Sequence, residues 1–588
     1  RAGVVYQFRL DPATRAWQEA GTLQARGLLA NEAFGTTVTL EGDVAYIGAP
    51  GNGGGYGAAF LFRRDTLTDT WVEQSRLVGF SGGRADRFGT AIAANGRDVW
   101  VGAPGSAPTG SAYVYAGATA DAFTSADLAK ATKSDPRDGF GQAIAMRGNV
   151  AAVGATALDF GAGGVFVFER NAAGQWRESA ALVSPPDALA AVTGKEVLCN
   201  EQGKAGIFDC KNAELLSFLP VPALTLNERG VRLSGIWGWT DARTNREYAL
   251  VGRNNGTSFV DITDPKKPVF LGDLPMTPGA RASSWREIKV YKDHAYIVSD
   301  GAGEHGMQVF DLTQLRAVKG APVKFEPTTL YKRINSAHNI VINEESGFAY
   351  SVGGSSGGET CGGGLHMIDV REPKNPKFAG CFADPQTGRA STGYSHDAQC
   401  VNYKGPDERY RGREICLGSN ETMLSIADVT DKNNPVAITR IGYPNVGYTH
   451  QGWLTDDQRY FYVNDELDET SGRVENTRTL VWDLSRLDDP QLIKEFMGNT
   501  RASDHNLYVL GNTMYQSNYV AGLRLIDISN PREPVEVGFL DTAPFGENNP
   551  GFSGSWSNYP FFKSGTIAVA SIGEGLFLVK KRDVKTVF

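Results

Sequence analysis

The stretch Leu525-Ile526-Asp527, followed by Pro531 and Pro534, decides the fold because variants of it recur along the chain. An aspartate at the end of a hydrophobic strand can accept the backbone N–H two residues on, and proline presets φ for a turn. The stretch therefore predicts a strand, a tight turn and a second strand. Two close copies precede it: Phe259-Val260-Asp261 with Pro265 and Pro268, and Met367-Ile368-Asp369 with Pro373 and Pro376.

Weaker copies extend this pattern into a series with a period of about 50 residues. They end at Asp311, Asp428 and Asp483, so the six aspartates are 50, 58, 59, 55 and 44 residues apart. A last copy, Leu576-Phe577-Leu578-Val579, lacks the aspartate. Each repeat is long enough for a four-stranded blade that packs on its neighbours. Seven such units predict a closed seven-bladed β-propeller over residues 230–588.

The first third of the chain carries a different repeat. Its units begin at Phe34-Gly35, Phe88-Gly89 and Phe140-Gly141, with the phenylalanines 54 and 52 residues apart. Each unit continues through a Gly-Ala-Pro or Gly-Ala-Thr turn to an alternating aromatic strand, as in Phe60-Leu61-Phe62, and a leftover strand lies at Val5–Phe8. Alternation of this kind is typical of half-buried strands. About three and a third units do not close a ring, so residues 1–184 are expected to be part of a longer propeller.

Length and composition agree with two all-β modules. At 588 residues the chain exceeds the roughly 250 to 300 residues that one hydrophobic core supports. Its 70 glycines, 10% aromatic residues and 21% charged residues fit many short strands joined by tight turns. The predicted fold class is all-β, with tandem β-propellers, the first incomplete and the second seven-bladed. Residues 185–229, which lack a repeat signal, are expected to connect them.

Charge and hydropathy exclude several partners. The net charge is −8 and no block of Lys or Arg occurs, which argues against nucleic acid and against an anionic membrane surface. No run of about 18 apolar residues predicts a spanning helix. The chain begins with Arg1 rather than Met, so we expect its start to have been processed or left out.

The six cysteines form three local pairs without CxxC spacing. This pattern argues against a zinc knuckle or thioredoxin-like motif. Two interpretations stay open, namely disulfides formed in an oxidising compartment and reduced cysteines in the core, and the pairing favours disulfides. The expected pairs are Cys199 with Cys210, Cys361 with Cys381, and Cys400 with Cys416.

Both repeats resemble known families. The first resembles the FG-GAP repeat of integrin-like propellers over residues 1–184, but no calcium loop of the DxDxDG kind occurs there, so we do not expect calcium in this module. The second resembles the LVIVD repeat. The histidine-containing pieces 336–339, 395–398, 449–453 and 504–507, with the Cys199–Cys210 segment, resemble the bacterial choice-of-anchor B family over about residues 195–585. This resemblance implies a secreted bacterial protein held at the cell surface by a variable C-terminal signal. No anchor is visible in the last residues, 581–588.

Four of the seven histidines occupy one column of the second repeat. Equivalent positions of successive blades are related by rotation about the central channel, so this column predicts a ring of imidazoles at one mouth. Alignment of the blades on their first strands places Arg286, His338, His396, His450 and His505 in this column and Glu287, Asn339, Asp397, Gln451 and Asn506 in the next. His294, His305 and His366 fall outside it and receive no role.

Two interpretations of the column stay open. His338, His396, His450 and His505 are candidate ligands for a divalent ion such as zinc, copper or nickel, because neutral imidazole is the commonest metal ligand. Alternatively, each histidine hydrogen-bonds within its blade or to its neighbour, as buried polar groups must. Arg286 repels a cation but suits a carboxylate or phosphate. It is therefore a candidate for ligand binding, together with the polar column Glu287, Asn339, Asp397, Gln451 and Asn506.

An acidic loop in the second module offers a further set of oxygen atoms. Asp465, Glu466, Asp468 and Glu469 suit calcium by chemistry, but their spacing matches no known calcium loop. A solvated charged turn is the favoured interpretation.

The sequence contains no GxSxG, HExxH or Walker motif, which favours a non-enzymatic role. We therefore expect a secreted, cell-surface propeller protein with a binding, adhesion or structural role toward an unidentified extracellular protein or glycan. One alternative is a metal-dependent enzyme or metal-binding protein that uses the histidine ring. Another is a subunit of an extracellular assembly, for which the incomplete first module is the hint.

Overall fold

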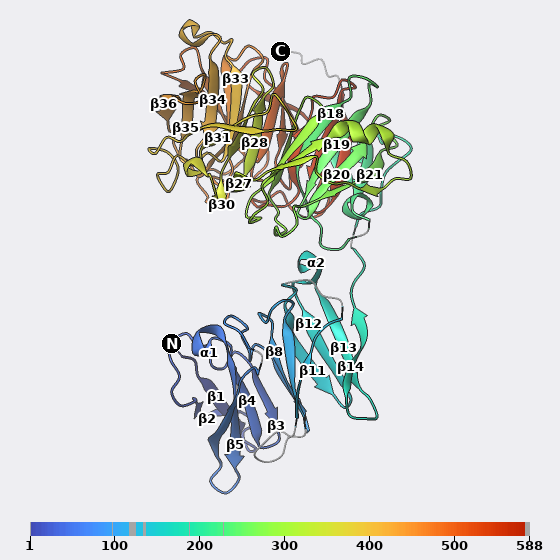
Figure 1. Ribbon diagram of the computed structural model, residues 1–588, viewed down its shortest axis with the longest axis vertical. Coiled ribbons are helices and arrows are strands. Elements are labelled where there is room, and N and C mark those ends of the chain that lie inside the picture. Colours follow the sequence, from blue (N-terminus) through green and yellow to red (C-terminus); the bar gives the residue numbers. More distant parts are fainter. Residues whose placement is uncertain are drawn as a thin grey trace. The chain divides into compact units, whose positions relative to one another are not determined.

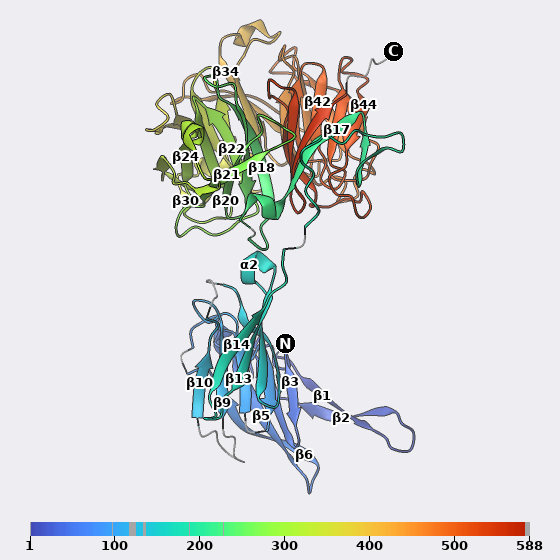
Figure 2. The same cartoon turned by 90° about the vertical axis from the view of Figure 1, so that its right-hand side faces the viewer.

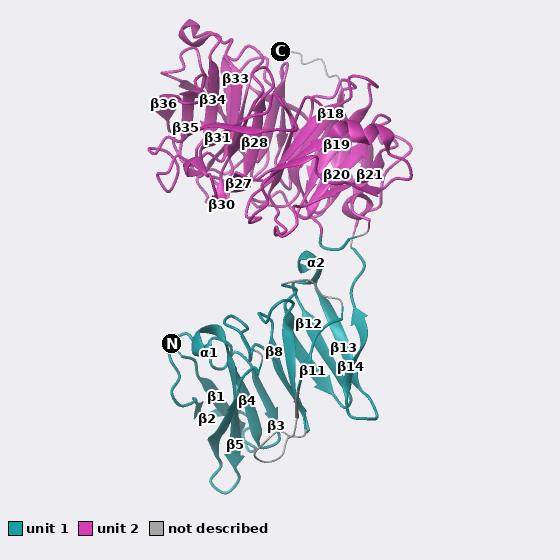
Figure 3. Ribbon diagram, viewed as in Figure 1, with its two compact units in different colours: residues 1–187, 228–230 teal, residues 188–227, 231–588 magenta. Residues whose placement is uncertain are grey.

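The computed structural model describes residues 2–80, 82–96, 98–116, 125–132, 137–186, 188–226 and 228–582. The chain divides into two compact units, residues 1–187 with 228–230 and residues 188–227 with 231–588 (Figure 3). Strands dominate both units, and nearly all of their sheets are antiparallel (Figure 1). Among the described residues, no helix combines the length and the apolar character needed to span a bilayer.

Among the residues that the structure describes, the first unit contains a hairpin and three four-stranded sheets. The hairpin is β1 (Val5–Leu10) with β2 (Trp17–Leu23). The sheets are β3 (Val38–Glu41), β4 (Val44–Ala49), β5 (Ala58–Asp65) and β6 (Thr70–Leu77); β7 (Ile92–Asn95), β8 (Asp98–Ala103), β9 (Ser111–Ala116) and β10 (Ser125–Ala129); and β11 (Phe140–Arg147), β12 (Val150–Ala155), β13 (Gly164–Arg170) and β14 (Trp176–Leu182). Two one-turn helices are α1 (Asn52–Gly55) and α2 (Leu158–Gly161).

The repeated glycines of this unit allow neighbouring sheets to touch through their backbones. A Cβ atom on Gly48 would lie 2.0 Å from the carbonyl oxygen of Gly89, and one on Gly102 would lie 1.9 Å from that of Gly141. Both distances are far below van der Waals contact. Glycine is therefore required at both positions because each faces the Phe-Gly turn of the next repeat.

In the part of the chain that the structure describes, the second unit is a ring of seven blades. Four antiparallel strands form the core of each blade. The first strands of neighbouring blades contact one another in a closed cycle around the channel, from β18 through β45 and back to β18. Blades one to four are β18 (Leu233–Thr240), β19 (Glu247–Arg253), β20 (Gly256–Asp261), β21 (Val269–Pro275); β22 (Arg286–Tyr291), β23 (His294–Ser299), β24 (Met307–Asp311), β26 (Thr329–Tyr331); β28 (Asn339–Asn343), β29 (Phe348–Val352), β31 (Leu365–Asp369), β32 (Lys377–Phe382); and β33 (Asp397–Asn402), β34 (Glu414–Ser419), β35 (Leu424–Asp428), β36 (Val436–Ile441). Blades five to seven are β37 (Thr449–Leu454), β38 (Tyr460–Asp465), β39 (Arg478–Asp483), β40 (Gln491–Met497); β41 (Asn506–Leu510), β42 (Thr513–Ser517), β43 (Leu523–Asp527), β44 (Val535–Leu540); and β45 (Ser555–Tyr559), β46 (Thr566–Ser571), β47 (Gly575–Lys581), β17 (Ala213–Pro220).

Short elements decorate these blades. They are β15 (Lys204–Ala205), β16 (Phe208–Lys211), β25 (Val323–Lys324), β27 (Ile334–Ser336), β30 (Ser355–Gly358) and the 3₁₀ turns at Val221–Leu224, Leu312–Ala317, Cys361–Gly363 and Glu408–Tyr410.

The last blade closes the ring by combining both ends of the unit. Strand β17 pairs with β47, with Ala213 opposite Lys581 and Pro220 opposite Gly575. Figure 2 shows β17 beside the red strands from the end of the chain. The stretch 185–229, expected as a connector, thus contributes strands to the propeller itself.

The recurrent aspartates form the turns that the sequence predicts. Each ends the third strand of its blade and accepts a hydrogen bond from the N–H two residues on. The donor–acceptor distances are 3.0 Å at Asp261, 3.1 Å at Asp311, 3.0 Å at Asp369, 3.0 Å at Asp428, 2.8 Å at Asp483 and 2.9 Å at Asp527.

All three predicted disulfides are present, which removes the alternative of reduced core cysteines. They join Cys199 to Cys210, Cys361 to Cys381, and Cys400 to Cys416. The last pair lies directly across β33 and β34, where the two cysteines oppose each other in the strand register.

Candidate metal centre at the propeller channel

The four column histidines lie side by side where the first strands begin. The ring centroids of His338 and His396 are 4.0 Å apart, those of His396 and His450 are 4.3 Å apart, and those of His450 and His505 are 4.5 Å apart. Trp556 of the seventh blade continues the row, 4.5 Å from His505. Five adjacent blades therefore contribute one continuous arc of rings.

Irregular strand pairing places these side chains in the arc. The register of β37 with β38 shifts between Thr449 and Gln451, so His450 is bulged out, and β45 has the same shift around Trp556. His338, His396 and His505 immediately precede the first paired residue of their strands. A bulge re-aims a side chain out of the regular alternation. At His450 and Trp556 the irregular pairing thus turns the ring toward its neighbours in the arc.

Each of the last three histidines donates its Nδ1–H to the next blade. Nδ1 of His396 lies 3.2 Å from the carbonyl oxygen of His450, Nδ1 of His450 lies 3.1 Å from that of His505, and Nδ1 of His505 lies 2.5 Å from that of Trp556. Because a carbonyl only accepts, Nδ1 is the protonated nitrogen of each neutral ring and Nε2 keeps its lone pair. The hydrogen bonds between neighbouring blades, which the structural interpretation of the column predicts, are therefore present. They leave Nε2 of each ring available as a metal ligand.

Burial keeps most of these rings neutral. Desolvation, reinforced by the neighbouring histidines, places the pKa of His396 and His505 well below the usual value. Desolvation also lowers the pKa of His450, although the carboxylate of Glu466 opposes this effect. At His338 desolvation is outweighed by a 3.1 Å hydrogen bond to Asp300, and the pKa is raised. His396, His450 and His505 are therefore in the protonation state that binds metals.

A carboxylate from another loop completes a three-residue cluster. Glu466 Oε2 lies 3.8 Å from His450 Nε2, and Glu466 Oε1 lies 3.7 Å from His505 Nε2. One ligand atom from each residue lies within 4.8 Å of the others. His450 Nε2 is buried and has no hydrogen-bond partner in the described structure. Tetrahedral zinc with Zn–N bonds of about 2.0–2.1 Å holds its ligand atoms roughly 3.4 Å apart, so the three side chains must move closer together to coordinate an ion.

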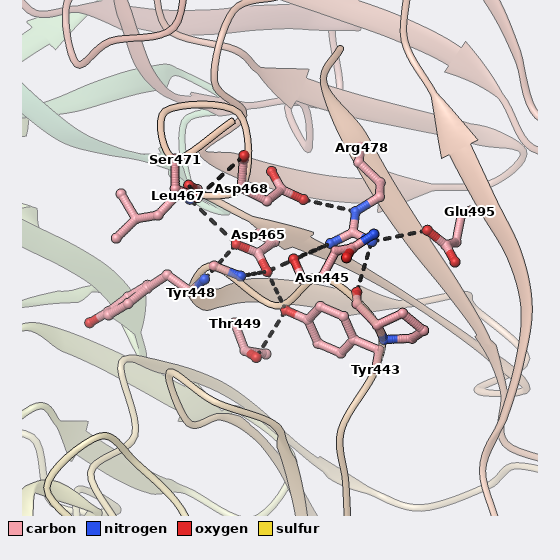
Figure 4. A network of polar contacts seen from close by, with 12 residues as sticks. Tyr443, Asn445, Tyr448, Thr449, Asp465, Leu467, Asp468, Ser471, Arg478 and Glu495 are labelled. Atoms are coloured by element: carbon pink, nitrogen blue, oxygen red, sulfur yellow. Dashed lines mark hydrogen bonds and ion pairs between the residues drawn. The ribbon is translucent and has the colours of Figure 1, made fainter. Parts of the chain in front are cut away.

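The acidic loop that supplies Glu466 is buried, so the expected solvated turn is wrong. The side chains of Asp465 and Asp468 are fully buried around Arg478, which is also fully buried (Figure 4). Arg478 Nε donates to Asp468 over 2.8 Å and Nη1 donates to Glu495 over 2.9 Å. The guanidinium supplies the positive charge that allows the carboxylates to leave water.

This network fixes the backbone on both sides of Glu466. Asp465 accepts a hydrogen bond from the hydroxyl of Tyr443 over 2.9 Å (Figure 4). It also accepts one from the N–H of Gly447 over 2.7 Å. Glu466 itself donates its N–H to the carbonyl of Tyr448 over 3.2 Å. The Tyr519 hydroxyl donates to Glu466 Oε1. The carboxylate is therefore presented to the histidines by a rigid support.

The ligand-binding candidates lie in the same channel but are mostly engaged with the protein. Arg286 Nε donates to the carbonyl of Arg253 over 2.9 Å, and Nη1 meets His305 Nε2 at 2.8 Å. In the next column, Glu287 accepts a hydrogen bond from the indole N–H of Trp556, and Asn506 donates one to the carbonyl of Trp556. Asn339 and Asp397 each accept a hydrogen bond from the backbone N–H of the residue that follows them. Gln451 forms hydrogen bonds with both the N–H and the carbonyl of Leu507. Burial raises the pKa of Asp397 to about 7.

A second cluster contains possible ligand atoms but differs in chemistry. Cys361, His366 and Cys381 lie close together. The two cysteines are joined to each other, and His366 is engaged through Nε2 with the Tyr331 hydroxyl and through Nδ1 with the carbonyl of Glu359. No thiolate is available for a metal in this state.

Comparison with known proteins supports both repeat assignments. An FG-GAP repeat matches residues 71–115, and an LVIVD repeat matches residues 505–542. No curated protein matches the chain.

The sequence alone did not indicate that Glu466, Tyr519 and Trp556 belong to the centre. Trp556 follows a serine, as His396 does, and this was the available signal. Glu466 directly follows the second strand of its blade, and Asp300, which bonds His338, occupies the same position in blade two.

Proposed function

We propose that this chain is an extracellular propeller protein that binds a divalent transition-metal ion through His450, Glu466 and His505. The observation that carries the proposal is the orientation of the imidazoles, which donate Nδ1–H to backbone carbonyls and direct Nε2 toward one carboxylate. Metal-ligating histidines in proteins are commonly fixed by such a bond from their other nitrogen. Two imidazoles and a carboxylate suit zinc, copper or nickel.

The disulfides support the extracellular location in this proposal. Three disulfides support an oxidising environment, since cytosolic thiols are kept reduced. The resemblance to the choice-of-anchor B family supports a bacterial cell-surface location as part of this proposal. A role in adhesion to a protein or glycan, and membership of an extracellular assembly, stay predictions, as does any catalytic use of the metal.

Metal titration of the purified full-length chain tests the proposal. After treatment with EDTA and desalting, calorimetry with Zn²⁺ and absorption spectroscopy with Co²⁺ should show one tight site. His450→Ala, His505→Ala and Glu466→Gln should each weaken binding by roughly 100-fold or more, because loss of even an outer-sphere partner costs 10- to 100-fold.

His294→Gln is the matched control. His294 is a buried histidine of the same unit outside the column, with Nδ1 bonded to the carbonyl of Lys292, so its loss should leave the metal affinity unchanged. Absence of a stoichiometric site for Zn²⁺, Cu²⁺, Ni²⁺ and Co²⁺ would refute the proposal. Equal weakening by all four variants would also contradict it.

A further inference from the structure

A separate cavity opens on the same inner strands, beyond the histidine arc. It encloses about 380 Å³ and is lined by residues from six of the seven first strands or the turns that follow them. Lys289, Gln399, Trp453 and Tyr559 line it. Each lies three residues after the residue that aligns with the arc histidines in its blade, namely Arg286, His396, His450 and Trp556. Three residues of strand span about 10 Å. The cavity and the proposed metal centre therefore occupy different levels of one channel.

One wall of this cavity is a rigid aromatic cluster. The ring centroids of Trp237 and Tyr559 are 5.0 Å apart, those of Trp453 and Tyr508 are 5.0 Å apart, and those of Tyr559 and Phe561 are 5.4 Å apart. Trp237, Trp453, Tyr559 and Phe561 line the cavity directly. Interlocked rings hold one another in place and present faces and edges on which a ligand ring can pack.

The other recognition element is the ammonium group of Lys289. This residue is only 6% exposed, and its Nζ lies 4.4 Å from the centroid of the Trp237 ring. Within the described part of the chain, Nζ has neither a hydrogen-bond acceptor nor a carboxylate at ion-pair distance. The side chain is largely buried, and the carboxylates of Glu287 and Asp397 act on it only from beyond ion-pair distance, so the three N–H donors of the ammonium lack an acceptor from the described residues. An anionic group placed in the cavity would satisfy it.

We propose that this cavity binds a small ring-bearing carboxylate, with its ring on the aromatic wall and its carboxylate on Lys289. The volume falls within the range of small-molecule sites. Glu344 and Glu345 also line the cavity, so the negative charge of the ligand must be confined to the end that reaches Lys289. Aromatic acids and sugar acids share this chemistry. The proposal does not depend on a bound metal.

Calorimetry on the EDTA-treated 588-residue chain distinguishes an aromatic acid from a sugar acid as the ligand. The probes are 1-naphthoate and D-glucuronate, each paired with its uncharged counterpart, 1-naphthamide or D-glucose. At least one acid should bind about 10-fold or more tightly than its counterpart, as expected for a hydrogen bond to a charged group. Binding of naphthoate alone identifies an aromatic acid, and binding of glucuronate alone identifies a sugar acid.

Variants assign the preference to particular residues. Lys289→Met should abolish the preference for the acid, Lys289→Arg should retain it, and Trp453→Leu should weaken the acid and its neutral counterpart alike. Lys292→Met is the matched control, since Lys292 is exposed and lies three residues further along the same hairpin. The His450→Ala variant should still bind the acid, which distinguishes this site from the metal centre.

Three outcomes would overturn the proposal. They are failure of both acids to bind, equal affinity for acid and neutral counterpart, and retention of the preference in a folded Lys289→Met protein. Because Lys289→Arg keeps the charge, its behaviour separates loss of recognition from loss of folding.

Discussion

Replacing Arg478 with methionine should destabilise the propeller and weaken metal binding together. The guanidinium is fully buried and bonds Asp468, Glu495 and the carbonyls of Pro444 and Asn445. Removal of one partner from a buried ion pair costs about 3–5 kcal/mol because the other charge stays uncompensated. For a unit of about 400 residues the unfolding entropy is about 0.8 kcal/mol/K, so the Tm should fall by about 4–6 °C.

Differential scanning calorimetry of the full-length chain measures this shift, and zinc titration of the same samples measures the loss of affinity. Arg409→Met is the control, because the Arg409 side chain is 49% exposed while it also pairs with two carboxylates, Asp407 and Asp488. The Asp407 side chain is only 4% exposed, but an arginine that is half open to water is screened and contributes less to stability than a fully buried one. Adding Asp468→Asn to Arg478→Met should recover part of the loss. Equal Tm values for the Arg478 and Arg409 variants would refute the assignment of Arg478 as the support of the Glu466 loop.

Two further predictions concern packing and pH. Gly102→Ala should destabilise the first unit strongly, because its Cβ would lie 1.9 Å from the Gly141 oxygen. Gly154→Ala, at the same position of the next repeat, should be mild, because its Cβ would lie 3.3 Å from the Ala143 Cβ and 3.7 Å from the Ala143 backbone N and O. Protease sensitivity of the first unit compares the two, and equal sensitivity would contradict the backbone-contact explanation. Burial lowers the pKa of His366 to about 4. Since the unfolded value is about 6.5, the unfolded state takes up its proton first as the pH falls, and stability should drop by about 2 kcal/mol between pH 6.5 and pH 5. Urea denaturation in EDTA at several pH values measures this slope, which His366→Gln should flatten; an unchanged slope would show that another group is responsible.

Much of the fold was predictable because its determinants are local. The six aspartates each bond a backbone N–H two residues away, and this interaction needs no distant partner. Repetition of that unit predicts a ring of blades. The cysteines of each pair are close in sequence, and this proximity predicts which cysteines form disulfides with each other. The same regularity placed four histidines in one column.

The tertiary structure decided what local patterns do not contain. Ring closure by β17 joins residues more than 350 positions apart, so no repeat signal marked its strand. The acidic loop became a buried support because Arg478, from the following strand, lies against it.

The candidate metal centre likewise combines a feature that the sequence determines with features that depend on the tertiary structure. The sequence by itself determined that imidazoles recur at one position in four of the blades. Only the closed ring decided that the Nδ1 atoms of His396, His450 and His505 meet neighbouring carbonyls, that Glu466 lies between two Nε2 atoms, and that Lys289 faces an aromatic cavity. Each of these relations involves groups from more than one blade, and their distances depend on how the blades pack around the channel.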